Sequence, residues 1–172
     1  MLRTSLPAAF LTVGLPYIVI ALIHHGPTNF RMRFTAAGLI AVLLIVPLQC
    51  MAEEYLFRGL VMQTLGSWIR VPAIAVLLQA VLFAAGHSYD MPGRVSILLM
   101  GLTFGAAAWI GGGLEAAFAY HLCLNYPIYL MQGFNLTTIT SKSTIYDILF
   151  AALTGAAYIA ALFLLKRKNK LV

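Results

Sequence analysis

The sequence predicts an all-α fold, a polytopic transmembrane bundle of about six helices. Of its 172 residues, 62% are hydrophobic, which leaves too little polar surface to cover a soluble protein of this size. Its apolar runs also approach the roughly 20 residues that an α-helix needs to cross a bilayer. We therefore expect residues 1–172 to form a single membrane-embedded domain without a soluble part.

Six apolar segments are interpreted as the helices, and breaks in the apolar pattern delimit them. The first ends before the His-His-Gly-Pro sequence at positions 24–27, and the second is unusually long. A turn with the sequence Asp-Met-Pro-Gly at 90–93 separates the third from the fourth, and glycines at 111–113 precede the fifth. The sixth begins near Asp147, an expected interfacial residue. The segments are 6–23, 36–66, 71–86, 95–111, 114–132 and 145–165.

The net charge of +6 comes largely from a basic tail at residues 166–170. Such a tail is typical of an anchor at the cytoplasmic face of a membrane, in contact with anionic lipid. With six spans both termini share one side, and the Lys and Arg count favours a cytoplasmic C-terminus. We expect a multi-pass integral membrane protein whose partner is the lipid bilayer. Nucleic-acid binding is not expected, because no basic surface interleaved with aromatic residues is present.

Two adjacent glutamates, Glu53 and Glu54, interrupt a strongly apolar stretch of a chain that has five acidic residues in total. An ionisable group at membrane depth costs roughly 2.5–3.5 kcal/mol, so such residues indicate function. Glu54 lies four residues before Arg58, the spacing of an ion pair within a helix. Glu53 has no such partner, and we interpret it as a general base.

Counting residues from the turns places four polar side chains at one depth. Glu53 precedes the turn between the second and third helices by about as many residues as separate that turn from His87, roughly 20 Å on each side. His121 and Asn125, four residues apart on the fifth helix, reach a similar depth and share a helix face. We predict that Glu53, His87, His121 and Asn125 face a common polar cavity.

Three motifs follow in series along the chain: E-E-x-x-x-R at 53–58, F-x-x-x-H at 83–87 and H-x-x-x-N at 121–125. In these motifs the sequence resembles the CAAX protease and bacteriocin-processing family of intramembrane endopeptidases, which also includes abortive-infection proteins. The resemblance covers residues 36–129 and implies a glutamate-type peptidase without a cofactor.

The resemblance implies a role for each motif residue. Glu53 and His87 would activate a water molecule, and His121 and Asn125 would donate hydrogen bonds to the oxyanion of the tetrahedral intermediate. Glu54 and Arg58 would support these four. The compact chain and its basic tail resemble bacterial members that process a peptide, a leader or a membrane-protein segment, so a bacterial cell membrane is the expected location.

Three other functions are consistent with the same residues. A non-catalytic immunity or scaffold protein could retain this fold, and a small transporter could use buried Glu and His residues as a proton relay. A zinc-dependent membrane protease could use Glu53, His87 and His121, which have the ligand types of a catalytic zinc site. No H-E-x-x-H motif brings these three together locally.

Overall fold

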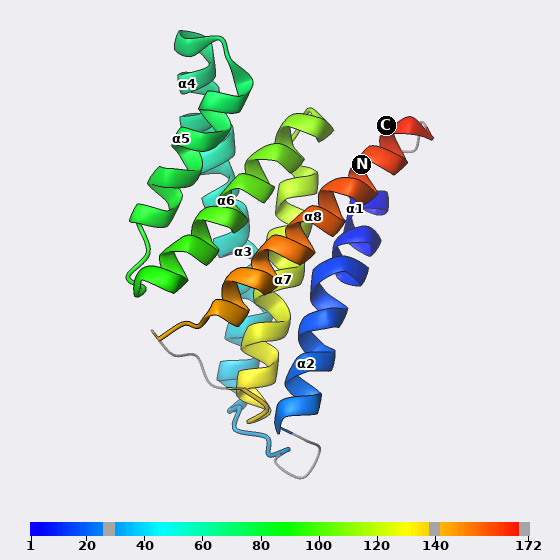
Figure 1. Ribbon diagram of the computed structural model, residues 1–172. Coiled ribbons are helices and arrows are strands. Elements are labelled where there is room, and N and C mark those ends of the chain that lie inside the picture. Colours follow the sequence, from blue (N-terminus) through cyan, green and yellow to red (C-terminus); the bar gives the residue numbers. More distant parts are fainter. Residues whose placement is uncertain (26–29, 138–141, 169–172) are drawn as a thin grey trace.

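The computed structural model describes residues 1–25, 30–137 and 142–168 (Figure 1). These residues form six continuous helices and no β-strand. The first two helices each contain a π-helical segment, labelled η1 and η3. In chain order the elements are α1 (Leu2–Ala9), η1 (Phe10–Gly14), α2 (Leu15–His25), α3 (Ala36–Glu54), η3 (Tyr55–Val61), α4 (Met62–Ile69), α5 (Pro72–Ala85), α6 (Met91–Gly111), α7 (Glu115–Gly133) and α8 (Ile145–Arg167).

The predicted all-α bundle of about six helices is confirmed, but its helices differ in their capacity to cross a membrane. Four helices of the described residues are long and apolar enough to do so, which is the pattern of a multi-pass membrane protein. These four helices are Leu2–Ile23, Ala36–Ile69, Met91–Gly111 and Ile145–Arg167. Of the two remaining helices, α5 has 14 residues and is therefore only about 21 Å long. The other, α7, carries the polar residues Glu115, His121 and Asn125.

Helix α6 lies at the centre of the bundle and packs against α5, α7 and α8 (Figure 1). Helix α3 packs on α7, and α1 contacts both α7 and α8. The beginning of α1 and the end of α8 lie at the same end of the bundle, as expected for an even number of crossings. The end of α8 is fixed there because Lys166 Nζ donates to the Ile110 carbonyl at 3.0 Å. Residues 169 and 170 of the basic tail lie outside the described residues, and the cytoplasmic location of the C-terminus stays a prediction.

Two glycines allow α5 and α6 to approach each other closely. A Cβ atom at Gly101 would lie 3.1 Å from the Cα and Cβ atoms of Ala80, and one at Gly105 would lie 3.0 Å from Val76 Cγ1. Small residues four apart permit such backbone contact between membrane helices. This contact is what brings the Gly101 carbonyl within reach of polar side chains.

A carboxylate outside the apolar core fixes the loop between α5 and α6. Asp90 is the N-cap of α6 and accepts from the Gly93 amide at 3.2 Å and from the Ser143 amide at 2.9 Å. These hydrogen bonds, that from Ser143 above all, hold the pKa of Asp90 below its ordinary value. The loop that carries His87 and Tyr89 is thereby attached to the residues before α8.

We predict that Asp90→Ala lowers the melting temperature of the purified protein in detergent. A depressed folded-state pKa means that the carboxylate stabilises the fold above its unfolded pKa, and that this contribution is lost as the pH falls through the folded pKa. The difference between variant and wild type should therefore shrink on acidification. A difference that stays constant from neutral to acidic pH would contradict this role, and Asp147→Ala, which removes the N-terminal carboxylate of α8, serves as the comparison.

Candidate active site

The two adjacent glutamates at the end of α3 have different environments. The Glu54 side chain is fully buried, whereas 23% of the Glu53 side chain is exposed. Consecutive residues of a helix point about 100° apart, so one can face the bundle core while the other faces a cavity. The π-helical segment η3 begins at the next residue, and π-bulges in helices are frequent at functional sites.

A buried ionic network is centred on the Oε1 atom of Glu54. This atom accepts from Arg58 Nη1 at 3.0 Å and lies 2.7 Å from His121 Nδ1. The ion pair expected between Glu54 and Arg58 is therefore present, and His121 on α7 joins it. Because an ionised carboxylate only accepts, Nδ1 of His121 carries the hydrogen of this bond.

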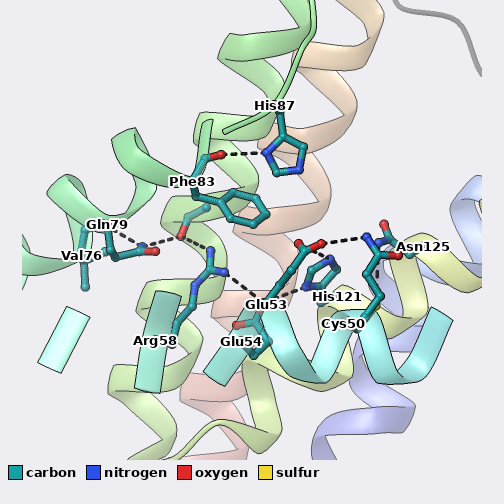
Figure 2. A network of polar contacts seen from close by, with 12 residues as sticks. Cys50, Glu53, Glu54, Arg58, Val76, Gln79, Phe83, His87, His121 and Asn125 are labelled. Atoms are coloured by element: carbon teal, nitrogen blue, oxygen red, sulfur yellow. Dashed lines mark hydrogen bonds and ion pairs between the residues drawn. The ribbon is translucent and has the colours of Figure 1, made fainter. Parts of the chain in front are cut away.

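Arg58 connects this network to α6. Its Nη2 atom donates to the Gly101 carbonyl at 3.3 Å, and the same carbonyl accepts from Gln79 Nε2 of α5 at 2.9 Å (Figure 2). The Arg58 guanidinium also lies 4.6 Å from the centre of the Phe83 ring and 4.7 Å from that of Phe104. Two aromatic faces and two oxygens thus surround a fully buried cation, as such a charge requires.

His121 lies between the two glutamates. Its Nδ1 side faces Glu54, and its Nε2 atom is 3.8 Å from Glu53 Oε2. The ring is stacked on Phe104 with centroids 4.6 Å apart. This packing fixes the ring plane, so the two nitrogens point to different carboxylates.

His87 follows the C-terminus of α5, and its orientation is set by the motif residue Phe83. The distance from His87 Nδ1 to the Phe83 carbonyl oxygen is 2.7 Å. A carbonyl oxygen only accepts, so Nδ1 is the protonated nitrogen and Nε2 of the neutral ring carries a lone pair. Figure 2 shows the Phe83 ring between the imidazole of His87 and the guanidinium of Arg58.

The side chains of Glu53, His87, His121 and Asn125 line a single cavity of about 170 Å³. The amide of Asn125 directs Nδ2 to Cys50 Sγ at 3.8 Å, which leaves its second N–H for another acceptor. Glu54 and Arg58 are not part of the cavity wall and lie behind it. The remaining wall residues are Gln49, Phe83, Tyr89, Ile97, Met100, Phe104, Leu124, Ile128 and Tyr129.

Two glutamines belong to this site and were not anticipated from the motifs. Gln49 donates to Glu53 Oε1 at 2.8 Å, and Gln79 is fully buried beside the Gly101 carbonyl. Each is a polar residue in an apolar helix, four positions before a motif residue, Glu53 and Phe83 respectively. This spacing could have indicated that the two glutamines belong to the site, because side chains four residues apart share a helix face.

The zinc hypothesis receives no support from the geometry. Although Glu53, His87 and His121 line one cavity, the described residues contain no group of three His, Cys, Asp or Glu side chains placed to hold a metal ion.

Comparison with known proteins identifies a family that the chain matches. The family model described as type II CAAX prenyl endopeptidase Rce1-like matches residues 33–127, more than half of the chain. This range includes all three motifs, the elements from α3 to α6, and α7 as far as Pro127. No curated protein and no solved structure matches the chain.

The geometry predicts that Glu54→Gln affects both stability and the site. Loss of the carboxylate leaves the buried Arg58 without its counter-ion, which costs about 3–5 kcal/mol, and it removes the charged acceptor of His121 Nδ1. A lowered melting temperature and a changed ¹⁵N signal of His121 Nδ1 should be measurable together. Glu115→Gln, in the first turn of α7, is the matched control, and an unchanged melting temperature for Glu54→Gln would contradict the prediction.

Proposed function

We propose, because the chain belongs to the type II CAAX prenyl endopeptidase Rce1-like family, that it is an intramembrane endopeptidase that hydrolyses a peptide bond with a water molecule activated by Glu53 and His87. The observation that carries this proposal is that two side chains line the same cavity: the half-buried carboxylate of Glu53, and the imidazole of His87, whose Nε2 has no hydrogen-bond partner among the described residues. We take the whole of residues 1–172 as one peptidase domain.

In the proposed reaction, a water molecule in the cavity gives a proton to Glu53 as its oxygen attacks the carbonyl carbon of the substrate. His87 Nε2 accepts the second hydrogen of that water in a hydrogen bond, which orients the attacking oxygen. The C–N bond of the tetrahedral intermediate then breaks, and the proton held by Glu53 passes to the leaving amine. Positioned acid and base groups of this kind contribute about 10²–10⁴-fold each.

The oxyanion that forms during attack would be stabilised by Asn125 and His121. Asn125 retains one N–H that is not directed at Cys50. His121 can donate from Nε2 only as an imidazolium, because Nδ1–H is bound to Glu54. An imidazolium at this position balances the charges, since two carboxylates then face one guanidinium and one imidazolium.

We infer that the substrate is a peptide or a membrane-protein segment, because two of the helices that line the cavity, α3 and α6, have the length and composition of membrane spans. Glu54 and Arg58 act behind the cavity by holding His121. Bacteriocin processing or a role in abortive infection in a bacterial cell membrane is the biological setting that the motif resemblance suggests.

Glu53→Gln should lower peptide cleavage by about 10²-fold or more through loss of the general base, with a melting temperature close to that of the wild type. Cleavage is measured with purified protein in liposomes and a library of fluorogenic peptides. Glu115→Gln, a glutamate outside the cavity wall, is the control and should retain activity. Equal turnover by Glu53→Gln and wild type would contradict the assignment of the base, and a wild type without any turnover would favour the scaffold function.

Cleavage should also survive exhaustive treatment with EDTA or phenanthroline, because the proposed water activation uses a carboxylate and an imidazole. The measurement compares initial rates before and after chelation. Loss of activity with recovery on addition of stoichiometric zinc would instead establish the zinc mechanism.

A further inference from the structure

Gln49 is the side chain that holds the carboxylate of Glu53. It lies one helical turn before Glu53 on α3, is half-buried, and donates from Nε2 to Glu53 Oε1 at 2.8 Å. Both residues line the cavity. The other oxygen of the carboxylate, Oε2, faces His121 Nε2. Glu53 therefore has an amide donor on one oxygen and an imidazole nitrogen beyond the other.

The second of these distances is longer than a hydrogen bond. Glu53 Oε2 and His121 Nε2 are 3.8 Å apart, whereas a charged N–H···O bond normally spans about 2.7–2.9 Å. Water would screen the attraction of a fully exposed pair, but His121 is only 3% exposed and Glu53 only 23%, so the attraction between them is stronger than at a protein surface. The ring of His121 cannot approach further, since Glu54 binds its Nδ1 and Phe104 stacks on its face. The carboxylate is thus the mobile partner, and Gln49 is the group that binds it on the opposite side.

We propose that Gln49 is a positioning residue that keeps Glu53 from closing on His121. This inference rests on the proposed function, in which Glu53 must accept a proton from water and His121 must donate to the oxyanion. A direct bond between the two would occupy both groups at once. With the Gln49 amide in place, the space between them stays available to the water molecule and the substrate carbonyl.

A purely local role for Gln49 makes a different prediction. A hydrogen bond between side chains four residues apart stabilises a helix only slightly, so a purely local pair would affect folding a little and catalysis not at all. A positioning role leaves stability and substrate binding nearly unchanged and lowers the rate of the chemical step. A fall in kcat at an unchanged KM therefore distinguishes the positioning role from the purely local one.

The first experiment compares Gln49→Met with wild type in liposomes. Methionine keeps the length and helix propensity of the side chain but has no donor. We expect kcat to fall about 10- to 100-fold, the effect of a small misplacement of a catalytic group, with KM changed by less than about twofold. Gln63→Met, at an exposed glutamine on α4, is the matched control and should leave both constants unchanged. A kcat for Gln49→Met within twofold of wild type overturns the proposal.

The second experiment observes His121 itself and does not require turnover. In protein labelled with ¹⁵N-histidine, the His121 signals are identified by their loss in His121→Gln. Gln49→Met should shift the Nε2 signal as Glu53 bonds to it, and the additional change Glu53→Gln should reverse most of that shift. A His121 signal that does not respond to Gln49→Met overturns the proposal. Absence of hydrolysis by the wild type would overturn the proposed function, and the NMR arm would still decide whether Gln49 holds Glu53 away from His121.

Discussion

The site depends on one oxygen atom, Oε1 of Glu54, which binds both Arg58 and His121 in the bundle interior. Removing charges from water costs several kcal/mol per ion, so a buried carboxylate persists only when its partners have good geometry. Here the partners come from η3 and α7, and Arg58 extends the connection to the Gly101 carbonyl of α6. One carboxylate therefore fixes three separate parts of the fold relative to each other. It also determines which nitrogen of His121 faces the cavity.

Aromatic residues provide the surroundings in which this charge network is stable. The rings of Phe83 and Phe104 contact the Arg58 guanidinium, and Phe104 stacks on His121. Phe83 acts twice, since its backbone carbonyl orients His87 while its ring covers Arg58. This double role gives a physical reason for the F-x-x-x-H spacing: the chain turns after Ala85, and four residues beyond Phe83 the imidazole lies beside the Phe83 carbonyl that binds it. The same phenylalanine thus connects His87, the histidine proposed to bind the water molecule, to the buried ion pair.

Much of this arrangement could be predicted from the sequence, because depth in a bundle follows from counting residues between turns. The counting argument placed Glu53, His87, His121 and Asn125 in one layer, and all four line one cavity. The contact between His121 and Glu54 could not be predicted, since it depends on the rotation of α7 about its axis. The hydrogen bond from Gln49 to Glu53 could not be predicted either, because two side chains four residues apart on a helix can form such a bond but need not do so. The predicted third helix, 71–86, agrees with α5 to within one residue at each end, and His87 lies in the turn that follows it.

The division of roles between the adjacent glutamates also explains how charge chemistry can proceed in an apolar bundle. In the proposed resting site two carboxylates face Arg58 and an imidazolium at His121, so the group is neutral. When Glu53 accepts a proton from water, the negative charge moves to the oxyanion, which lies beside the same imidazolium. The net charge of the cavity is then unchanged between ground state and intermediate, and no ion has to be solvated anew. This balance requires that Glu54 stays ionised and paired throughout, and its ion pair with Arg58 at 3.0 Å favours that state.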